Sequence, residues 1–388
     1  MTASLYFQGR LNTTEWSNGT VVVRKEYYFN NWMTLLSQLP LLLFTLLNSI
    51  LYQRISEAIR IAGSLVFILL LFILTAVLVK VPMGEDRFFS VTMATIWFIN
   101  SFGAVLQGSL FGLVGLLPQK YSAVFMSGQG LAGTFAAIAM LIAIGSDADS
   151  ESAALGYFIT PCVGTLLTLF SYLLLSRLVS QLIVSLSPKL DYLNNSLSHK
   201  KKVFYIMFCV FSKKTITFSF LQIWVMAFCV TFVFTVTLSV FPAVTADVRT
   251  IFSQKWERFF ISVCCFLTFN INDWLGRTIT TLIRWPRKES RLFPVLVVSR
   301  VVFIPLLMFC NVQSRNYLPV YFSHDAAFTA IMALFSLSSG YFVCLSMSYA
   351  PQLVEPKDAE TAGALMTFFL ALGLSIGAAL SFPLRALV

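Results

Sequence analysis

The residues of this chain that are best placed to do chemistry are a carboxylate and a guanidinium within one apolar run. In the segment CFLTFNINDWLGR, residues 265–277, Asp273 and Arg277 stand four residues apart and therefore share one helix face. Phe266 and Asn270 extend the same stripe. A ring, a carboxamide, a carboxylate and a guanidinium on one face suit a ligand that carries hydroxyl groups and a flat base. These residues alone support equally a structural ion pair between helices, because a charge in an apolar helix is costly unless it is paired.

A second polar side chain in apolar surroundings is Gln107, in the run NSFGAVLQGSLFG at residues 100–112. A buried carboxamide offers both a donor and an acceptor, as recognition of a nucleobase edge requires. A hydrogen bond to a neighbouring helix is the interpretation that this residue alone favours. Arg300, within another apolar stretch, is interpreted as the partner of a buried acid or of backbone carbonyls rather than of a ligand.

Several kinds of chemistry lack the residues that they require. The sequence has no cluster of paired aspartates, no serine–histidine pair and no HExxH motif, so an enzyme is not supported. It also has no GxxxxGK phosphate loop for ATP-driven pumping. The seven cysteines lie in apolar runs without a CxxC pair, which indicates buried thiols. With only His199 and His324 as histidines, neither a metal site nor another cofactor is expected.

The composition indicates a membrane protein. Of the 388 residues, 57% are hydrophobic and 11% are charged, whereas soluble domains have about 45–50% apolar and about 25% charged residues. A bilayer accepts so much apolar surface because lipid then acts as the solvent. The net charge of +10 is interpreted as a topology signal rather than a site for a nucleic acid polymer, since Lys and Arg collect in cytoplasmic loops.

The chain is predicted to be all-α and to cross the lipid bilayer ten times. Helices satisfy their own backbone polar groups in lipid, and runs of this length lack the alternation of barrel strands. The predicted spans lie at 32–52, 59–80, 88–112, 121–145, 155–179, 217–243, 258–283, 292–311, 326–350 and 361–384. They divide the chain into an extracellular segment at 1–31, an N-terminal bundle at 32–179, a cytoplasmic linker at 180–216 and a C-terminal bundle at 217–388.

Basic residues and sequons predict the orientation of the bundle. With residues 1–31 outside, the inner loops hold more Lys and Arg than the outer segments do, as the positive-inside rule requires. Sequons at Asn12 and Asn18 fall in the outer segment, where they would be glycosylated.

Glycines at helical spacing predict where helices approach closely. In lipid, helices associate through close packing of small residues rather than through exclusion of water. We therefore interpret Gly128 and Gly130 in MSGQGLAG, and Gly373 and Gly377 near the C-terminus, as packing positions.

Long motifs cover nearly the whole chain except about 180–215. They are NNWMTLLSQLPLLLFTLLNS (30–49), INSFGAVLQGSLFG (99–112), SGQGLAG (127–133), LGYFITPCVG (155–164), FTVTLSVFPA (234–243), CFLTFNINDWLGR (265–277) and ETAGALMTFFLALGLS (360–375). Together they resemble the equilibrative nucleoside transporter family, solute carrier family 29, and most closely its second mammalian subtype. The resemblance implies a fold similar to the major facilitator architecture, with eleven helices arranged six plus five. It also implies ion-independent, downhill passage of purine and pyrimidine nucleosides across the plasma membrane, with nucleobases as further cargo.

The resemblance also implies roles for single residues. Gln107 would contact the base, and Asp273 and Arg277 would face the ribose. Two leucines would line the wall of the cavity, Leu41 and Leu374. Four further residues would narrow it: Phe241, Pro242, Phe266 and Asn270.

The chain departs from the family at its start. The opening helix of the family, with its GLGTLLPWNFF-like motif, has no counterpart here, and MTASLYFQGRL resembles the stretch just after it. The expectation is a central cavity with one open wall and weak transport by this form. A truncated, non-transporting membrane protein of the same family is the alternative.

Arg60 and Glu360 both lie at the predicted cytoplasmic mouth, and we hypothesise that they pair across the two bundles to close the inner gate. Two solvated helix-end charges are the equally weighted alternative.

Arg60→Glu and Glu360→Arg are each expected to lower uridine uptake, measured at matched surface amounts in transport-null cells. The combined swap is expected to restore uptake, because the pair re-forms with reversed polarity. Failure of the swap to rescue would contradict the pairing.

Overall fold

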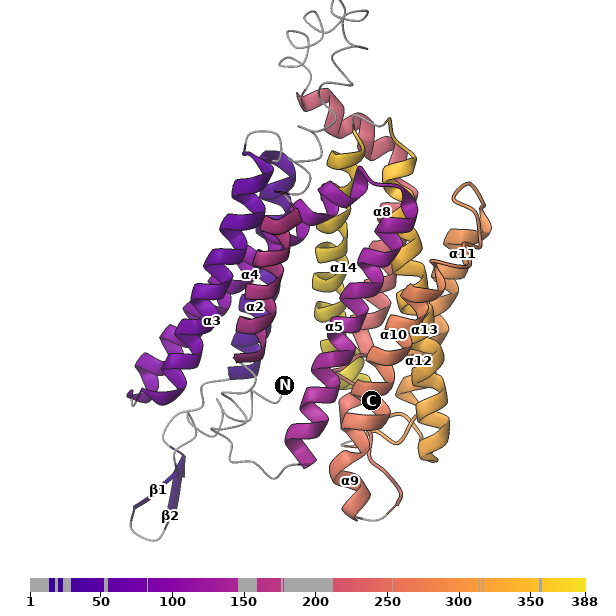
Figure 1. Ribbon diagram of the computed structural model, residues 1–388. Coiled ribbons are helices and arrows are strands. Elements are labelled where there is room, and N and C mark those ends of the chain that lie inside the picture. The colour runs from indigo at the N-terminus through magenta and orange to yellow at the C-terminus, as the bar shows by residue number, and fades with distance from the viewer. Residues whose placement is uncertain are drawn as a thin grey trace, which may run out of the picture.

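The protein is a bundle of helices whose axes are roughly aligned (Figure 1). The structure is a computed structural model. It describes residues 14–17, 20–23, 29–51, 55–81, 83–145, 159–175, 177, 212–252, 254–313, 315, 317–355 and 358–388. Strands β1 (Thr14–Ser17) and β2 (Thr20–Val23) form an antiparallel hairpin, drawn below the lower end of α3 in Figure 1, which the sequence analysis does not predict.

Helical segments account for the rest of the named elements. In the first half of the chain they are α2 (Phe29–Leu51), the π-helical η1 (Ile59–Gly63), α3 (Ser64–Lys80), α4 (Glu85–Gly115) and α5 (Gln119–Gly145). An apolar helix at Ile159–Leu175 follows. In the second half they are α8 (Ser212–Val240), η3 (Thr245–Asp247), α9 (Gln254–Phe260), the π-helical η4 (Ile261–Leu267), α10 (Thr268–Ile279), α11 (Leu292–Ser299), η5 (Arg300–Val302), α12 (Phe303–Met308), α13 (Asp325–Tyr349), η6 (Ala350–Gln352) and α14 (Ala359–Leu387).

The prediction of an all-α membrane fold is confirmed. Six helices in the described residues are long and apolar enough to cross a bilayer: Ile59–Leu78, Glu85–Gly115, Gln119–Ile142, Gln222–Asp247, Asp325–Gln352 and Ala359–Leu387. Shorter apolar helices occupy Leu36–Leu51, Ile159–Leu175 and Leu292–Met308. The remaining predicted span, 258–283, is divided among α9, η4 and α10. Every predicted span therefore contains helix, while the number of crossings stays a prediction.

Helix α14 lies along α8 at backbone distance. A methyl group added at Gly373 would be 2.5 Å from the carbonyl oxygen of Thr231, and one at Gly377 would be 2.8 Å from that of Thr235. Only glycine fits such a close approach without moving a helix. The predicted packing role of Gly373 and Gly377 is therefore confirmed.

The same helix also contacts the first half of the chain. Gly363 lies against the carbonyl oxygen of Phe111 in α4. Ser49 of α2 donates a hydrogen bond of 3.2 Å to the carbonyl oxygen of Ala364. Helix α14 thus joins α8 on one side to α2 and α4 on the other (Figure 1).

Helices α10 and α13 form a second close pair. Gly276 of α10 lies against the carbonyl oxygen of Leu337, and Gly340 of α13 lies against that of Asp273. Gly276 thus contacts α13 and Gly340 contacts α10, and the two contacts are one helical turn apart. Neither helix can move away or rotate without losing them. The predicted functional face of α10 is held in place by this pair.

Helix α5 packs across the bundle on α10. A methyl group at Gly130 would be 2.9 Å from Cα of Trp274, so the packing prediction is confirmed there. It is wrong for Gly128, where a methyl group meets no described residue within 4 Å. Residues two apart on a helix point about 200° apart, so the two glycines cannot both face α10. Gly133, three residues from Gly130, lies against the side-chain oxygen of Asn270 and is the second packing position.

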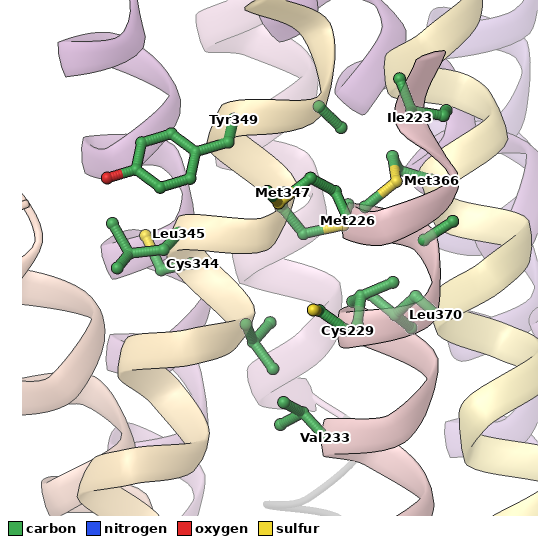
Figure 2. Packing of buried hydrophobic residues seen from close by; sticks show 14 of the residues in the cluster. Ile223, Met226, Cys229, Val233, Cys344, Leu345, Met347, Tyr349, Met366 and Leu370 are labelled. Atoms are coloured by element: carbon green, nitrogen blue, oxygen red, sulfur yellow. The ribbon is translucent and has the colours of Figure 1, made fainter. Parts of the chain in front are cut away.

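A buried apolar cluster fills the space between α8, α13 and α14. Figure 2 shows Met226 and Cys229 of α8 beside Met347 of α13 and Met366 and Leu370 of α14. Methionine side chains suit such a junction, because their flexible thioethers fill irregular gaps between helices.

Arg300 is enclosed by the second half of the chain and is 2% exposed. Its guanidinium donates to the carbonyl oxygens of Val233 at 3.1 Å and Phe335 at 3.3 Å. It also donates to the hydroxyls of Ser338 at 3.1 Å and Thr237 at 3.2 Å. The interpretation of Arg300 as a partner of backbone carbonyls is confirmed.

The close pair formed by α10 and α13 gives a stability prediction. Gly340→Ala is expected to destabilise the protein by about 1–3 kcal/mol, because the added methyl group forces the two backbones apart. Gly103→Ala on α4 is the matched control, since none of the residues that the structure describes lies within 4 Å of its added methyl group. Alanine is about 1 kcal/mol better than glycine inside a helix, so the control should unfold at the same or a higher temperature. Equal thermal midpoints for the two detergent-solubilised variants would contradict the close packing.

Candidate functional site

The candidate site is built on an ion pair inside α10. Nε of Arg277 donates to Oδ2 of Asp273 at 2.7 Å, and the two side chains are 12% and 11% exposed. The spacing of four residues within one helix brings these groups together, as the sequence predicts. Pairing of this kind lowers the cost of placing ionisable side chains in apolar surroundings.

The ion pair leaves hydrogen-bonding groups unused. A guanidinium has five N–H donors, and within the described chain Arg277 uses one of them, at Nε. The carboxylate of Asp273 accepts through Oδ2 alone, so Oδ1 has no partner among these residues. The pair can therefore offer two NH2 groups and a carboxylate oxygen to a ligand, which is the donor and acceptor set that neighbouring hydroxyl groups require.

The pair lies where α5 meets α10. A methyl group added at Gly130 of α5 would be 3.1 Å from Cδ of Arg277, so the arginine stem lies against this glycine. Ser127 of α5 is 2.8 Å from the hydroxyl of Thr278 and accepts from Nε1 of Trp274 at 3.2 Å. These contacts tie the two helices together through the residues that directly follow Asp273 and Arg277. The motif MSGQGLAG contains Ser127, but its spacing does not reveal the partner.

Asn270 is fixed by the same interface. Its Nδ2 donates to the carbonyl oxygen of Phe266 at 2.8 Å, and its backbone oxygen accepts from Thr134 of α5 at 3.0 Å. Its side-chain oxygen lies against Gly133. Asn270 thus stands one helical turn before Asp273 with its Nδ2 bonded within α10, and its role in the site stays a prediction.

An aromatic cluster lies next to this wall. The ring of Phe241, at the end of α8, stacks on Phe269 with centroids 4.0 Å apart, and it meets Phe266 edge-on at 5.7 Å. Pro242 follows directly and is half-buried. The structure brings the predicted narrow part, Phe241 with Pro242 and Phe266, together. Phe269 is a member that the sequence analysis missed, although it stands four residues before Asp273 and therefore on the same helix face.

Gln107 lies on α4 and is half-buried. Its carboxamide makes no hydrogen bond in the part of the chain that the structure describes, so the favoured interpretation of a bond to a neighbouring helix finds no support. Gln38 on α2 has a buried side-chain oxygen that likewise has no partner among the described residues. Unused amide groups on two helices of the first half are available for a polar ligand. The structure shows no hydrogen bond between Gln107 and the ion pair within these residues.

Leu41 and Leu374 are both half-buried, on α2 and α14. Leu374 packs on the apolar cluster of α8, α13 and α14. The helices that carry the two leucines are in contact. Their place on a cavity wall stays a prediction.

Charged groups gather where η1 faces the start of α14. Arg60 is 6% exposed and donates to the carbonyl oxygen of Ile55 at 3.1 Å and to Ser109 at 3.2 Å. Burial raises the pKa of the Glu57 carboxyl, the negative charge of Glu360 raises it further, and Arg60 lowers it. Glu57 is therefore close enough to both Arg60 and Glu360 to feel their charges. A direct pair between Arg60 and Glu360 stays a prediction.

A cavity of about 220 Å³ lies between α2, α3 and α4. The hydroxyls of Ser37, Thr75 and Thr95 in its wall all donate to carbonyl oxygens of their own helices. The cavity therefore presents mainly apolar surface, and none of the predicted substrate residues lines it. It is separate from the candidate site.

The predicted glycosylation sites remain untested. Asn12 and Asn18 lie outside the described residues, so glycosylation stays a prediction. Within the described ranges, no group of three His, Cys, Asp or Glu side chains is arranged to hold a metal ion.

Comparison with known proteins identifies the family. A sequence profile described as nucleoside transporter matches residues 93–386. The chain belongs to this family. It is 49% identical to equilibrative nucleoside transporter 2 of Rattus norvegicus and to that of Homo sapiens, with all of this chain and 93% of each relative covered. It is 50% identical to equilibrative nucleoside transporter 1 of Homo sapiens, over 93% of this chain and 83% of that relative.

Family membership confirms the resemblance read from the motifs. The family consists of transporters rather than enzymes. With its several membrane-spanning helices, this nucleoside transporter family member is a multi-pass membrane protein.

The ion pair of this family member gives a test of coupling. Asp273→Asn or Arg277→Gln alone is expected to destabilise the fold by about 3–5 kcal/mol, because each leaves one unpaired charge in apolar surroundings. The double variant removes both charges and is expected to recover most of that loss. Thermal midpoints of the purified proteins measure the effect. A double variant whose loss equals the sum of the two single losses would show that the charges are not coupled.

Proposed function

We propose that this protein is a facilitative, ion-independent carrier of purine and pyrimidine nucleosides in the plasma membrane, and that nucleobases are further substrates. The observation that carries the proposal is the ion pair of Asp273 and Arg277, which is nearly buried and still has unused donors and an unused acceptor. The names of the relatives, equilibrative nucleoside transporters 1 and 2, support the same substrate class.

In this proposal the ribose hydroxyls bind to the ion pair. The NH2 groups of Arg277 donate to hydroxyl oxygens, and Oδ1 of Asp273 accepts from a hydroxyl group. Bonds to charged groups contribute about 1.5–3 kcal/mol each, which is enough to replace part of the hydration that the ribose loses. A neutral sugar needs no counter-ion, so the net charge of the site stays zero with or without substrate.

The base is held by the first half of the chain. The carboxamide of Gln107 can donate to and accept from a base edge, because no described residue occupies it. Leu41 and Leu374 line the faces of the base, while Phe241, Pro242, Phe266 and Asn270 narrow the passage beside it. A substrate that contacts α4 through its base and α10 through its ribose draws the two halves together.

Transport follows by alternating access. Bound nucleoside favours the closed arrangement because only that arrangement lets both halves contact it at once, and a ligand shifts a conformational equilibrium by its difference in affinity for the two states. The charged group of Arg60, Glu57 and Glu360 opens and closes one end of the passage.

The test is uptake of radiolabelled uridine in transport-null cells at matched surface amounts. Asp273→Asn/Arg277→Gln is expected to lower uptake about a hundredfold, because two bonds to charged groups are lost. The matched control is Arg249→Gln/Glu257→Gln. It neutralises an exposed ion pair outside α10, whose nitrogen and oxygen are 2.6 Å apart, and should leave uptake unchanged. Adenine is expected to compete with uridine if nucleobases share the site. Absence of uridine uptake despite normal surface labelling would contradict the nucleoside assignment.

A further inference from the structure

The loop between α10 and α11 combines basic and apolar side chains on its surface. Residues 284–291 contain four basic side chains, Arg284, Arg287, Lys288 and Arg291, against one acidic side chain, Glu289. Large apolar side chains are exposed on the same loop: Leu282 is 85% exposed, Ile283 58% and Trp285 58%. A loop at the end of a membrane helix places such side chains at the level of the lipid headgroups, where tryptophan is favoured.

This loop is held rigidly by the helices behind it. The hydroxyl of Tyr341 on α13 donates to the carbonyl oxygen of Trp285 at 2.6 Å and accepts from its N–H at 3.2 Å. Tyr349 donates to the carbonyl oxygen of Pro286 at 3.0 Å. These bonds hold the backbone of the loop against α13.

Two of the four basic side chains are already engaged. Arg284 donates to the side chain of Gln119 at 3.2 Å, and Lys288 donates to the carbonyl oxygen of Gln352 at 3.3 Å. Arg287 and Arg291 are both exposed and make no hydrogen bond or ion pair within the described residues. The N–H of Ser290 donates to the carbonyl oxygen of Arg287 at 3.0 Å, so the two free arginines flank one tight turn.

We propose that Arg287 and Arg291 bind the headgroup of an anionic phospholipid, with Leu282, Ile283 and Trp285 set into the headgroup layer beside it. Two guanidinium groups on either side of a turn suit a phosphate, because arginine binds phosphate oxygens with paired N–H donors. The positive-inside rule places this loop on the cytoplasmic side, and the cytoplasmic leaflet carries the anionic lipids.

A lipid, rather than a free phosphate, accounts for the apolar side chains. A soluble anion would neutralise the arginines and leave Leu282 and Ile283 in water. A phospholipid covers both groups at once, its phosphate on the arginines and its glycerol and acyl carbonyl region against the apolar surface.

The experiment measures which lipid lies next to Trp285. The full chain is reconstituted into phosphatidylcholine nanodiscs that contain a small fraction of either brominated phosphatidylserine or brominated phosphatidylcholine. Bromine quenches nearby tryptophan fluorescence, and subtracting the signal of Trp285→Phe isolates this residue from the other tryptophans. Brominated phosphatidylserine is expected to quench Trp285 at about a tenfold lower lipid fraction than brominated phosphatidylcholine.

Substitutions of the two arginines test the headgroup contact. Arg287→Gln/Arg291→Gln is expected to abolish the preference for phosphatidylserine, while Arg287→Lys/Arg291→Lys keeps the charge and most of the preference. Arg87→Gln is the matched control, because Arg87 is an exposed arginine at the start of α4 and is not part of this loop. Equal thermal midpoints of these variants show that the fold is retained.

Several results would overturn the proposal. Equal quenching by the two lipids in the unaltered protein would do so, as would a preference that survives Arg287→Gln/Arg291→Gln. Added glycerophosphoserine, which carries the headgroup without acyl chains, is expected to leave the quenching unchanged. If it abolishes the preference at a concentration similar to that of the lipid, the loop binds soluble phosphate and not a phospholipid.

Discussion

The structure depends on close backbone contact between helices at glycine. In lipid, two apolar helix faces gain little by meeting each other, so association relies on tight packing and on hydrogen bonds that such packing allows. Gly373 and Gly377 hold α14 to α8, while Gly276 and Gly340 hold α10 to α13. The orientation of α10 follows from these contacts.

Two arginines in the second half of the chain differ in how many of their N–H donors the protein itself uses. Arg300 has carbonyl and hydroxyl oxygens on every side, and its hydrogen bonds join α8 and α13. Among the described residues Arg277 has a single hydrogen-bond partner, Asp273, and it lies against a glycine of another helix. Arg300 uses four of its five N–H donors within the bundle, which leaves little capacity for a ligand, whereas the unused donors of Arg277 can bind hydroxyl groups. The location of the site therefore rests on which donors remain, more than on which charges are buried.

Sequence patterns predict the parts of this structure that depend on one helix. Apolar length predicts the spans, and a spacing of four predicts the contact of Asp273 with Arg277. Patterns fail where the outcome depends on a partner from elsewhere in the chain. Gly128 and Gly130 are equivalent in the sequence, yet only Gly130 faces another helix. Phe269 joins the aromatic cluster because the end of α8 reaches it, which no local spacing reveals.

The enclosure of Arg300 bears on how the chain is made. An arginine at the centre of a helix costs about 2.5–3.5 kcal/mol when that helix enters the bilayer alone. The partners of Arg300 on α13, Ser338 and Phe335, come later in the chain, while those on α8 come earlier. During synthesis, the segment of α11 and α12 therefore waits with half of its polar partners missing. The segment gains its remaining hydrogen bonds only when α13 is inserted. A ribosome that stalls between α12 and α13 therefore leaves a charge in lipid with only part of its polar partners.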